Sequence, residues 1–117
     1  MKRFNCVYFQ TEAGKIPVKE FIDALHLRTQ QKFFNMIELL KDYGKSLPKP
    51  HAAYVNDDIY ELRFIGIEGK IRIFYFFFDG SKIVLTNGFI KKTQKAPKKE
   101  IETAKNRMRR YFEKMKK

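Results

Sequence analysis

The sequence from Ile59 to Lys95, IYELRFIGIEGKIRIFYFFFDGSKIVLTNGFIKKTQK, contains three runs of β-branched and aromatic residues separated by two glycine-containing turns. Such runs, bounded by turn residues, predict β-strands joined by hairpins. The dipeptide Asp79-Gly80 favours a two-residue type I′ turn, because both central residues of that turn need positive φ. The stretch therefore predicts three antiparallel strands around which the rest of the chain folds.

The two turns also predict which residues lie opposite each other. A two-residue loop at Asp79-Gly80 places Arg72 opposite Asn87, and a four-residue loop at Gly66–Gly69 places Arg63 opposite Arg72. Because side chains alternate between the faces of a strand, Arg63, Arg72 and Asn87 then form a row on one face.

Two explanations of this arginine pair are open, because like charges directly opposite each other destabilise a sheet. In the first, this end of the face is solvated and one loop length is wrong by a residue, which would send the two side chains to opposite faces. In the second, the pair is an anion site, since two guanidinium groups offer planar sets of donors that fit phosphate.

The other face of the sheet is predicted to be apolar and covered by helices. Its residues are Tyr60, Leu62, Phe64, Ile71, Ile73, Tyr75, Phe77, Val84 and Ile90.

The segment before the sheet predicts a helical hairpin that covers this apolar face. Pro17 suits a first helical position, and the apolar residues after it recur at i, i+3, i+4 and i+7. Thr29 is the expected N-cap of a second helix that ends at Gly44. The inner residues of the two helices are Val18, Phe21, Ile22 and Leu25, then Phe33, Met36, Ile37 and Leu40.

The remaining segments complete a single α+β domain over residues 1–117. Asn5 to Phe9 predicts a short strand, and 47–58 predicts an irregular polar connection with a turn at Asp57-Asp58. Pro97 opens a terminal helix that is apolar on one side and basic on the other. The predicted order is β-α-α-β-β-β-α, a helical hairpin packed on a small antiparallel sheet.

The chain is strongly basic, and its charge is concentrated at the C-terminus. The formal net charge is +12, of which +9 comes from residues 91–117, with 12 Lys and Arg against 3 Asp and Glu. This asymmetry indicates a polyanionic partner, either a nucleic acid or an acidic protein. A membrane surface is the weaker alternative, because the terminal helix has core-facing residues and the chain has no Trp.

Several kinds of chemistry lack their sequence signatures. His26, His51 and Cys6 do not have metal-ligand spacing, and there is neither a phosphate-binding Gly-rich loop nor a nucleophile elbow. We therefore expect no metal and no cofactor. Without a signal peptide or a spanning apolar segment, the expected location is the cytoplasm. Cleavage of RNA remains compatible with such a chain, because the substrate's own 2′-OH is the nucleophile.

Three motifs carry a resemblance to a known family. Tyr60-Glu61-Leu62-Arg63, the run from Arg72 to Phe76, and the run from Gly88 to Pro97 resemble the HigB-type, phage-derived branch of the RelE toxin superfamily. The resemblance covers most of the chain. It implies a RelE-like fold and a toxin of a toxin–antitoxin pair, an endoribonuclease that cuts mRNA on the ribosome. The implied partner is a helix-turn-helix, HigA-like antitoxin.

The resemblance also implies roles for individual residues. Arg63 and Arg72 match the strand arginines that bind and polarise the scissile phosphate, and Lys91 and Lys92 match basic residues at the end of the last strand. We therefore expect Arg63, Arg72 and Lys92 to be catalytic. The expected RNA-binding residues are Lys91, Lys95, Asn87, Lys49 and His51.

Two departures from the family pattern leave the proton-transfer residues open. Position 87 is Asn where many relatives have His, and Tyr111 lies inside the terminal helix and does not match a C-terminal catalytic Tyr. His51, Tyr75 and Lys95 are the substitutes. The alternative function is a non-catalytic basic module that binds nucleic acid or protein, such as an inactive toxin relative.

Overall fold

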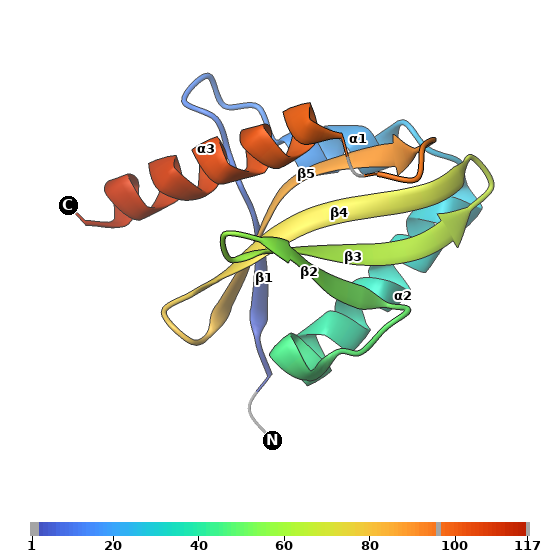
Figure 1. Ribbon diagram of the computed structural model, residues 1–117, viewed down its shortest axis with the longest axis horizontal. Coiled ribbons are helices and arrows are strands. Elements are labelled where there is room, and N and C mark those ends of the chain that lie inside the picture. The colour runs from blue at the N-terminus through green and yellow to red at the C-terminus, as the bar shows by residue number, and fades with distance from the viewer. Residues whose placement is uncertain (1–2, 96, 117) are drawn as a thin grey trace.

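The computed structural model describes residues 3–95 and 97–116 as an α+β fold, which confirms the predicted fold class (Figure 1). The elements are β1 (Asn5–Tyr8), α1 (Pro17–Asp23), α2 (Leu27–Tyr43), the 3-10 helix η1 (Gly44–Ser46), β2 (Ala52–Asn56), β3 (Ile59–Gly66), β4 (Gly69–Phe78), β5 (Lys82–Lys91) and α3 (Lys98–Met115). The strands form one sheet in the order β1-β5-β4-β3-β2. β1 is parallel to β5, and the other neighbouring strands are antiparallel.

Strand β2 is absent from the predicted order, because the segment 47–58 was expected to be irregular. The strand has only the five residues AAYVN, between the prolines and the Asp57-Asp58 turn, and alanine has a low strand propensity. The strand forms through pairing with β3, where Ala52 lies opposite Leu62. The predicted turn is confirmed, since Asp57 and Asp58 both have positive φ, of 47° and 68°.

The β4–β5 hairpin differs from the predicted register at two places. Phe78 lies opposite Lys82 and not Ser81, so the loop has one more residue than predicted. A bulge at Thr86 adds another, and Arg72 therefore lies opposite Phe89. The prediction that Asn87 lies directly opposite Arg72 is wrong. Together the two errors shift the register by two residues. Because side chains alternate with a period of two, Asn87 stays on the face that carries Arg72.

Helix α2 begins before the predicted cap. The N-cap is His26, whose Nδ1 accepts a hydrogen bond from the Arg28 backbone N–H at 3.1 Å. Thr29 is instead a buried residue of the first turn, only 1% exposed. Its hydroxyl donates to Glu68 Oε1 at 2.7 Å and accepts from the backbone N–H of Ile67 at 3.0 Å. Thr29 thus ties the β3–β4 turn to α2. The predicted helix end at Gly44, with φ of 53°, is confirmed.

Loss of the Thr29 hydroxyl is expected to destabilise the fold. Thr29→Val keeps the shape of the side chain but leaves the Ile67 N–H and one Glu68 oxygen without this partner, so we expect the free energy of unfolding to fall by about 1–3 kcal/mol. Chemical denaturation measures this change. Thr103→Val is the matched control, because the Thr103 hydroxyl bonds only the Lys99 carbonyl within α3, and its effect should be clearly smaller. Equal effects of the two substitutions would contradict this account of Thr29.

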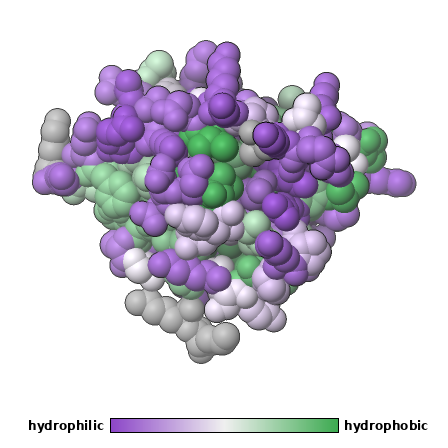
Figure 2. All heavy atoms as spheres, in the orientation of Figure 1, coloured by the Kyte–Doolittle hydropathy of each residue, from purple (hydrophilic) through white to green (hydrophobic). Residues whose placement is uncertain are grey.

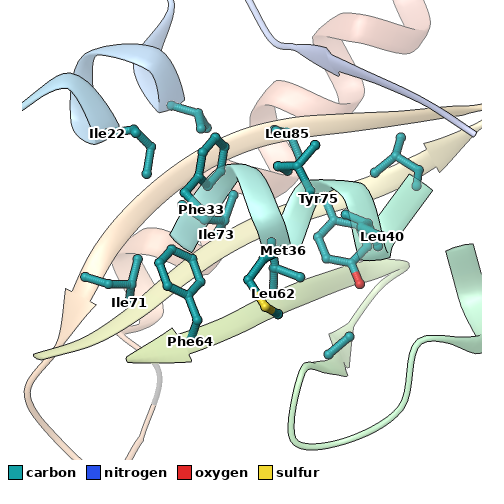
Figure 3. Packing of buried hydrophobic residues seen from close by; sticks show 14 of the residues in the cluster. Ile22, Phe33, Met36, Leu40, Leu62, Phe64, Ile71, Ile73, Tyr75 and Leu85 are labelled. Atoms are coloured by element: carbon teal, nitrogen blue, oxygen red, sulfur yellow. The ribbon is translucent and has the colours of Figure 1, made fainter. Parts of the chain in front are cut away.

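Two hydrophobic cores lie on opposite faces of the sheet. Helices α1 and α2 cover one face, where residues such as Phe33, Leu62 and Tyr75 pack together (Figure 3). This is the predicted apolar face, with one correction. Val84 lies on the other face with Phe76, because the longer hairpin loop places these two residues opposite each other.

Helix α3 covers part of the second face (Figure 1). Its apolar side, which the sequence predicts, packs there through Ile101, Ala104, Met108 and Tyr111. Met115, near the end of the helix, is 44% exposed. None of the helices in the described part of the chain is both long and apolar enough to cross a membrane.

Candidate anion-binding site

Two arginines lie side by side on the face of the sheet that α3 partly covers. Arg63 of β3 and Arg72 of β4 are Cα partners in the sheet, as the Gly66–Gly69 turn predicts. The β2–β3 register continues to His51, whose carbonyl accepts the Arg63 backbone N–H at 2.8 Å. His51 itself belongs to the turn before β2, and its side chain is exposed. The row on the arginine face is therefore Arg63, Arg72 and Phe89, with the backbone of His51 beside Arg63 and no place for Asn87.

A buried carboxylate lies between the two arginines. Glu61 is 5% exposed, and its Oε2 is 3.1 Å from Arg63 Nη2 while its Oε1 is 3.3 Å from Arg72 Nε. Burial lowers the pKa of the Arg72 guanidinium, Glu61 opposes that shift and Arg63 adds to it. An arginine stays protonated in proteins, so the trio of Glu61, Arg63 and Arg72 carries a net charge of +1.

Each arginine keeps one terminal nitrogen that the protein does not use. Arg72 Nη1 donates to the Ile71 carbonyl at 3.0 Å, and Arg63 Nη2 donates to Glu61. In the described part of the chain, Arg72 Nη2 and Arg63 Nη1 form no hydrogen bond to protein. Neither atom is one of the buried side-chain atoms that lack a partner, so both can be reached from outside. These two nitrogens are available to an anion at the surface of the sheet.

Lysines extend the positive charge beyond the arginine row. Lys70 and Lys91 lie opposite each other in the next row of the same face, and Lys70 is exposed. Lys92 and Lys95 are exposed in the segment that leads from β5 to α3. Hydrophilic residues cover most of the upper part of the molecule in Figure 2, where α3 runs in Figure 1. A long anion bound at the arginines therefore has further cations beside it.

The first turn of α3 is attached to the sheet through Asn87. Asn87 is 4% exposed, and its Nδ2 donates to the Glu100 carbonyl at 3.1 Å and to Glu100 Oε1 at 2.9 Å. Its Oδ1 accepts from the Thr86 hydroxyl at 2.6 Å. The Asn87 amide is thus used in holding α3 on the sheet. Arg107 adds to this attachment, because its Nη1 donates to the Thr86 carbonyl at the bulge, at 2.9 Å.

Tyr75, a predicted proton-transfer residue, lies away from the arginines. Tyr75 is in the core between α2 and the sheet, on the opposite face, and burial raises the pKa of its hydroxyl (Figure 3). It therefore has no access to a substrate bound at Arg63 and Arg72. Lys49 is exposed in the loop before β2.

A comparison with protein families matches residues 20–109 to the phage-derived Gp49-like proteins (DUF891). The matched segment contains the hairpin helix α2, strands β2 to β5 and most of α3, and hence the whole arginine row. The chain belongs to the Gp49-like family. Gp49-like proteins are RelE/ParE-like toxins associated with toxin–antitoxin systems, which suggests an antitoxin partner for this chain. A search of curated proteins gave no match.

Two residues of this Gp49-like site were missed at the level of sequence, Glu61 and Lys70. Strand alternation carried a signal for both, since Glu61 lies two residues before Arg63 and Lys70 two residues before Arg72. Each belongs to the same face as its arginine, and the Gly66–Gly69 turn already defined the pairing.

Proposed function

We propose that this Gp49-like protein is a HigB-type toxin, a metal-independent endoribonuclease that cuts mRNA on the ribosome. The observation that supports this proposal best is the pair of arginines in register on one face, each with an outward nitrogen that the protein leaves unused. Two such donors, a sheet spacing apart, can bind the two non-bridging oxygens of one phosphodiester.

The chemistry of the proposed reaction requires binding, orientation and proton transfer. The 2′-oxygen attacks the adjacent phosphorus while the bond from phosphorus to the 5′-oxygen breaks, which gives a 2′,3′-cyclic phosphate and a 5′-hydroxyl. Arg63 and Arg72 offset the negative charge that develops on the phosphoryl oxygens. Lys92 adds charge stabilisation at the reacting phosphate, and Lys91 and Lys95 bind the neighbouring backbone.

His51 is the residue that we assign to proton transfer. It is exposed, its backbone lies next to Arg63, and an imidazole can accept the 2′-OH proton or protonate the 5′-oxygen. Lys95 is the remaining candidate, because its exposed position after β5 leaves it free to reach the substrate. Lys49, in the loop before His51, is placed to contact RNA on that side.

The proposal is tested by producing the protein in a bacterial host and mapping the 5′ ends of cellular transcripts. We expect growth arrest and new 5′ ends inside translated messages. Blocking translation initiation before induction should remove these ends if cleavage depends on the ribosome. Co-production of a helix-turn-helix antitoxin from the same locus should restore growth. Normal growth and unchanged transcripts in the presence of folded protein would contradict the proposal.

A non-catalytic binding module is the second candidate, and Asn87 favours it. At this position many relatives have His, whereas the Asn87 amide here is used to bond Glu100, and a purely binding surface needs no proton-transfer residue. Such a module should bind RNA with a steep dependence on salt and yield no cleavage products.

A further inference from the structure

We propose that Glu61 is a positioning residue, whose carboxylate holds Arg63 and Arg72 in the orientation that binds one phosphodiester. This inference rests on the proposed function, since it explains how the arginine pair becomes competent for cleavage. Glu61 itself does not contact the substrate.

The position of Glu61 links two strands through one carboxylate. Glu61 and Arg63 belong to β3 and Arg72 belongs to β4, and the two carboxylate oxygens are divided between the arginines. Arg72 is fixed further by the Ile71 carbonyl. Each guanidinium is therefore held from the inner side, and its unused nitrogen lies on the outer side.

Stability alone does not account for a charged trio at this place. A buried ion pair rarely stabilises a fold more than apolar residues of the same size do, because both charges lose their hydration. The sheet around the trio is apolar, with Phe74 opposite Glu61 and Phe89 opposite Arg72. An apolar residue at position 61 would suit these neighbours, so the carboxylate calls for another explanation.

Incomplete hydrogen bonding in the trio supports a functional explanation. Among the described residues, the buried side-chain atoms without a hydrogen-bond partner are Glu61 Oε1, Arg63 Nε and Arg72 Nε. All three belong to the trio, although the other buried side-chain nitrogens and oxygens of the described residues have hydrogen-bond partners. Glu61 Oε1 and Arg72 Nε attract each other as an ion pair at 3.3 Å without forming a hydrogen bond. Buried polar groups with incomplete hydrogen bonding are costly, so the trio needs an explanation other than stability.

The charge of Glu61 predicts a specific kinetic effect. Two guanidinium groups directly opposite each other repel, and Glu61 offsets that repulsion. Without the negative charge, the side chains are expected to turn apart while the site becomes more positive. RNA would still bind, but the phosphate would no longer contact the guanidinium groups of both arginines. A displacement of about 1 Å can lower the rate about 100-fold.

The experiment compares Glu61→Gln with the wild type and with Glu100→Gln. The control suits the purpose because Glu100 lies on the same side of the sheet, and glutamine can still accept the bond from Asn87 through its side-chain oxygen. Cleavage of an RNA that contains one mapped site gives kcat and KM. Binding of the same RNA with 2′-O-methyl groups, which cannot be cut, gives an affinity that is independent of chemistry. Thermal melting gives the folded fraction.

We expect Glu61→Gln to lower kcat about 100-fold, with KM and the affinity for 2′-O-methyl RNA unchanged or tighter, and Glu100→Gln to behave as wild type. An unchanged kcat per folded molecule would overturn the proposal, and so would a parallel loss of kcat and RNA affinity. A wild-type protein that does not cut RNA would instead overturn the proposed function.

Glu61→Asp keeps the inference testable if Glu61→Gln does not fold. Aspartate retains the charge but is one methylene shorter, so it cannot reach both arginines as glutamate does. We expect kcat to fall at least about tenfold with KM unchanged, because one guanidinium loses its support. Full kcat in a folded Glu61→Asp protein would overturn the proposal.

Discussion

Replacement of Arg72 by lysine is expected to lower the cleavage rate about 100- to 1,000-fold, because a lysine keeps the charge but loses the planar set of donors. In the structure, Arg72 is 8% exposed, its Nη1 donates to the Ile71 carbonyl and its Nε forms an ion pair with Glu61. A lysine has one nitrogen and cannot make both contacts while also binding a phosphate. The rate of cleavage at a mapped site in a purified message measures the effect.

The control for this substitution is Arg107→Lys. Arg107 is also a partly buried arginine on the α3 side of the sheet, and burial lowers the pKa of its guanidinium as it does for Arg72. Its contact, however, is the Thr86 carbonyl and not the arginine row. We expect Arg107→Lys to lower stability somewhat and to leave the cleavage rate per folded molecule unchanged. Equal cleavage rates for the two variants would show that Arg72 is not part of the site.

Removal of the His51 side chain is expected to lower kcat about 100- to 10,000-fold, the range for loss of a general acid or base. The backbone should not change in His51→Ala, because the bond to Arg63 uses the His51 carbonyl. RNA affinity should change little, since Arg63, Arg72 and the lysines remain.

His26→Ser is the matched control for His51→Ala. His26 caps α2 through its side chain, and serine can serve as an N-cap in its place. We expect wild-type kcat and the wild-type pH profile for this variant. If His51→Ala retains full kcat, proton transfer belongs to another residue, and Lys95→Ala becomes the substitution to test.

Local turn chemistry explains what could be predicted of the fold. The four-residue turn at Gly66–Gly69 fixed the β3–β4 pairing and thereby brought Arg63 and Arg72 together. The spacing of apolar residues likewise predicted the inner faces of the helices. Both kinds of pattern depend only on residues that are close in sequence.

Features that depend on residues far apart in sequence could not be predicted. The bulge at Thr86 is stabilised by Arg107, 21 positions later in the chain, and the β2 strand exists because β3 provides its partner. Thr29 looked like a cap, but its hydroxyl bonds Glu68, 39 residues away. The strong capping preference of threonine was overridden by this tertiary contact.

The candidate site could also be predicted only in part. The arginine pair and the lysines after β5 were visible in the sequence, whereas the burial of Asn87 under Glu100 depends on where α3 docks. The place of His51 beside Arg63 depends on β2 in the same way, because the β2–β3 pairing brings the two backbones together.

The most direct test of the account is cleavage of a message in which the single 2′-OH at a mapped cut is replaced by hydrogen. The account predicts cleavage of the all-ribose message to a 2′,3′-cyclic phosphate and a 5′-hydroxyl, and no cleavage at that position in the 2′-deoxy message, although both bind equally. Cleavage of the 2′-deoxy message at the same position, or products with a 5′-phosphate, would contradict the account.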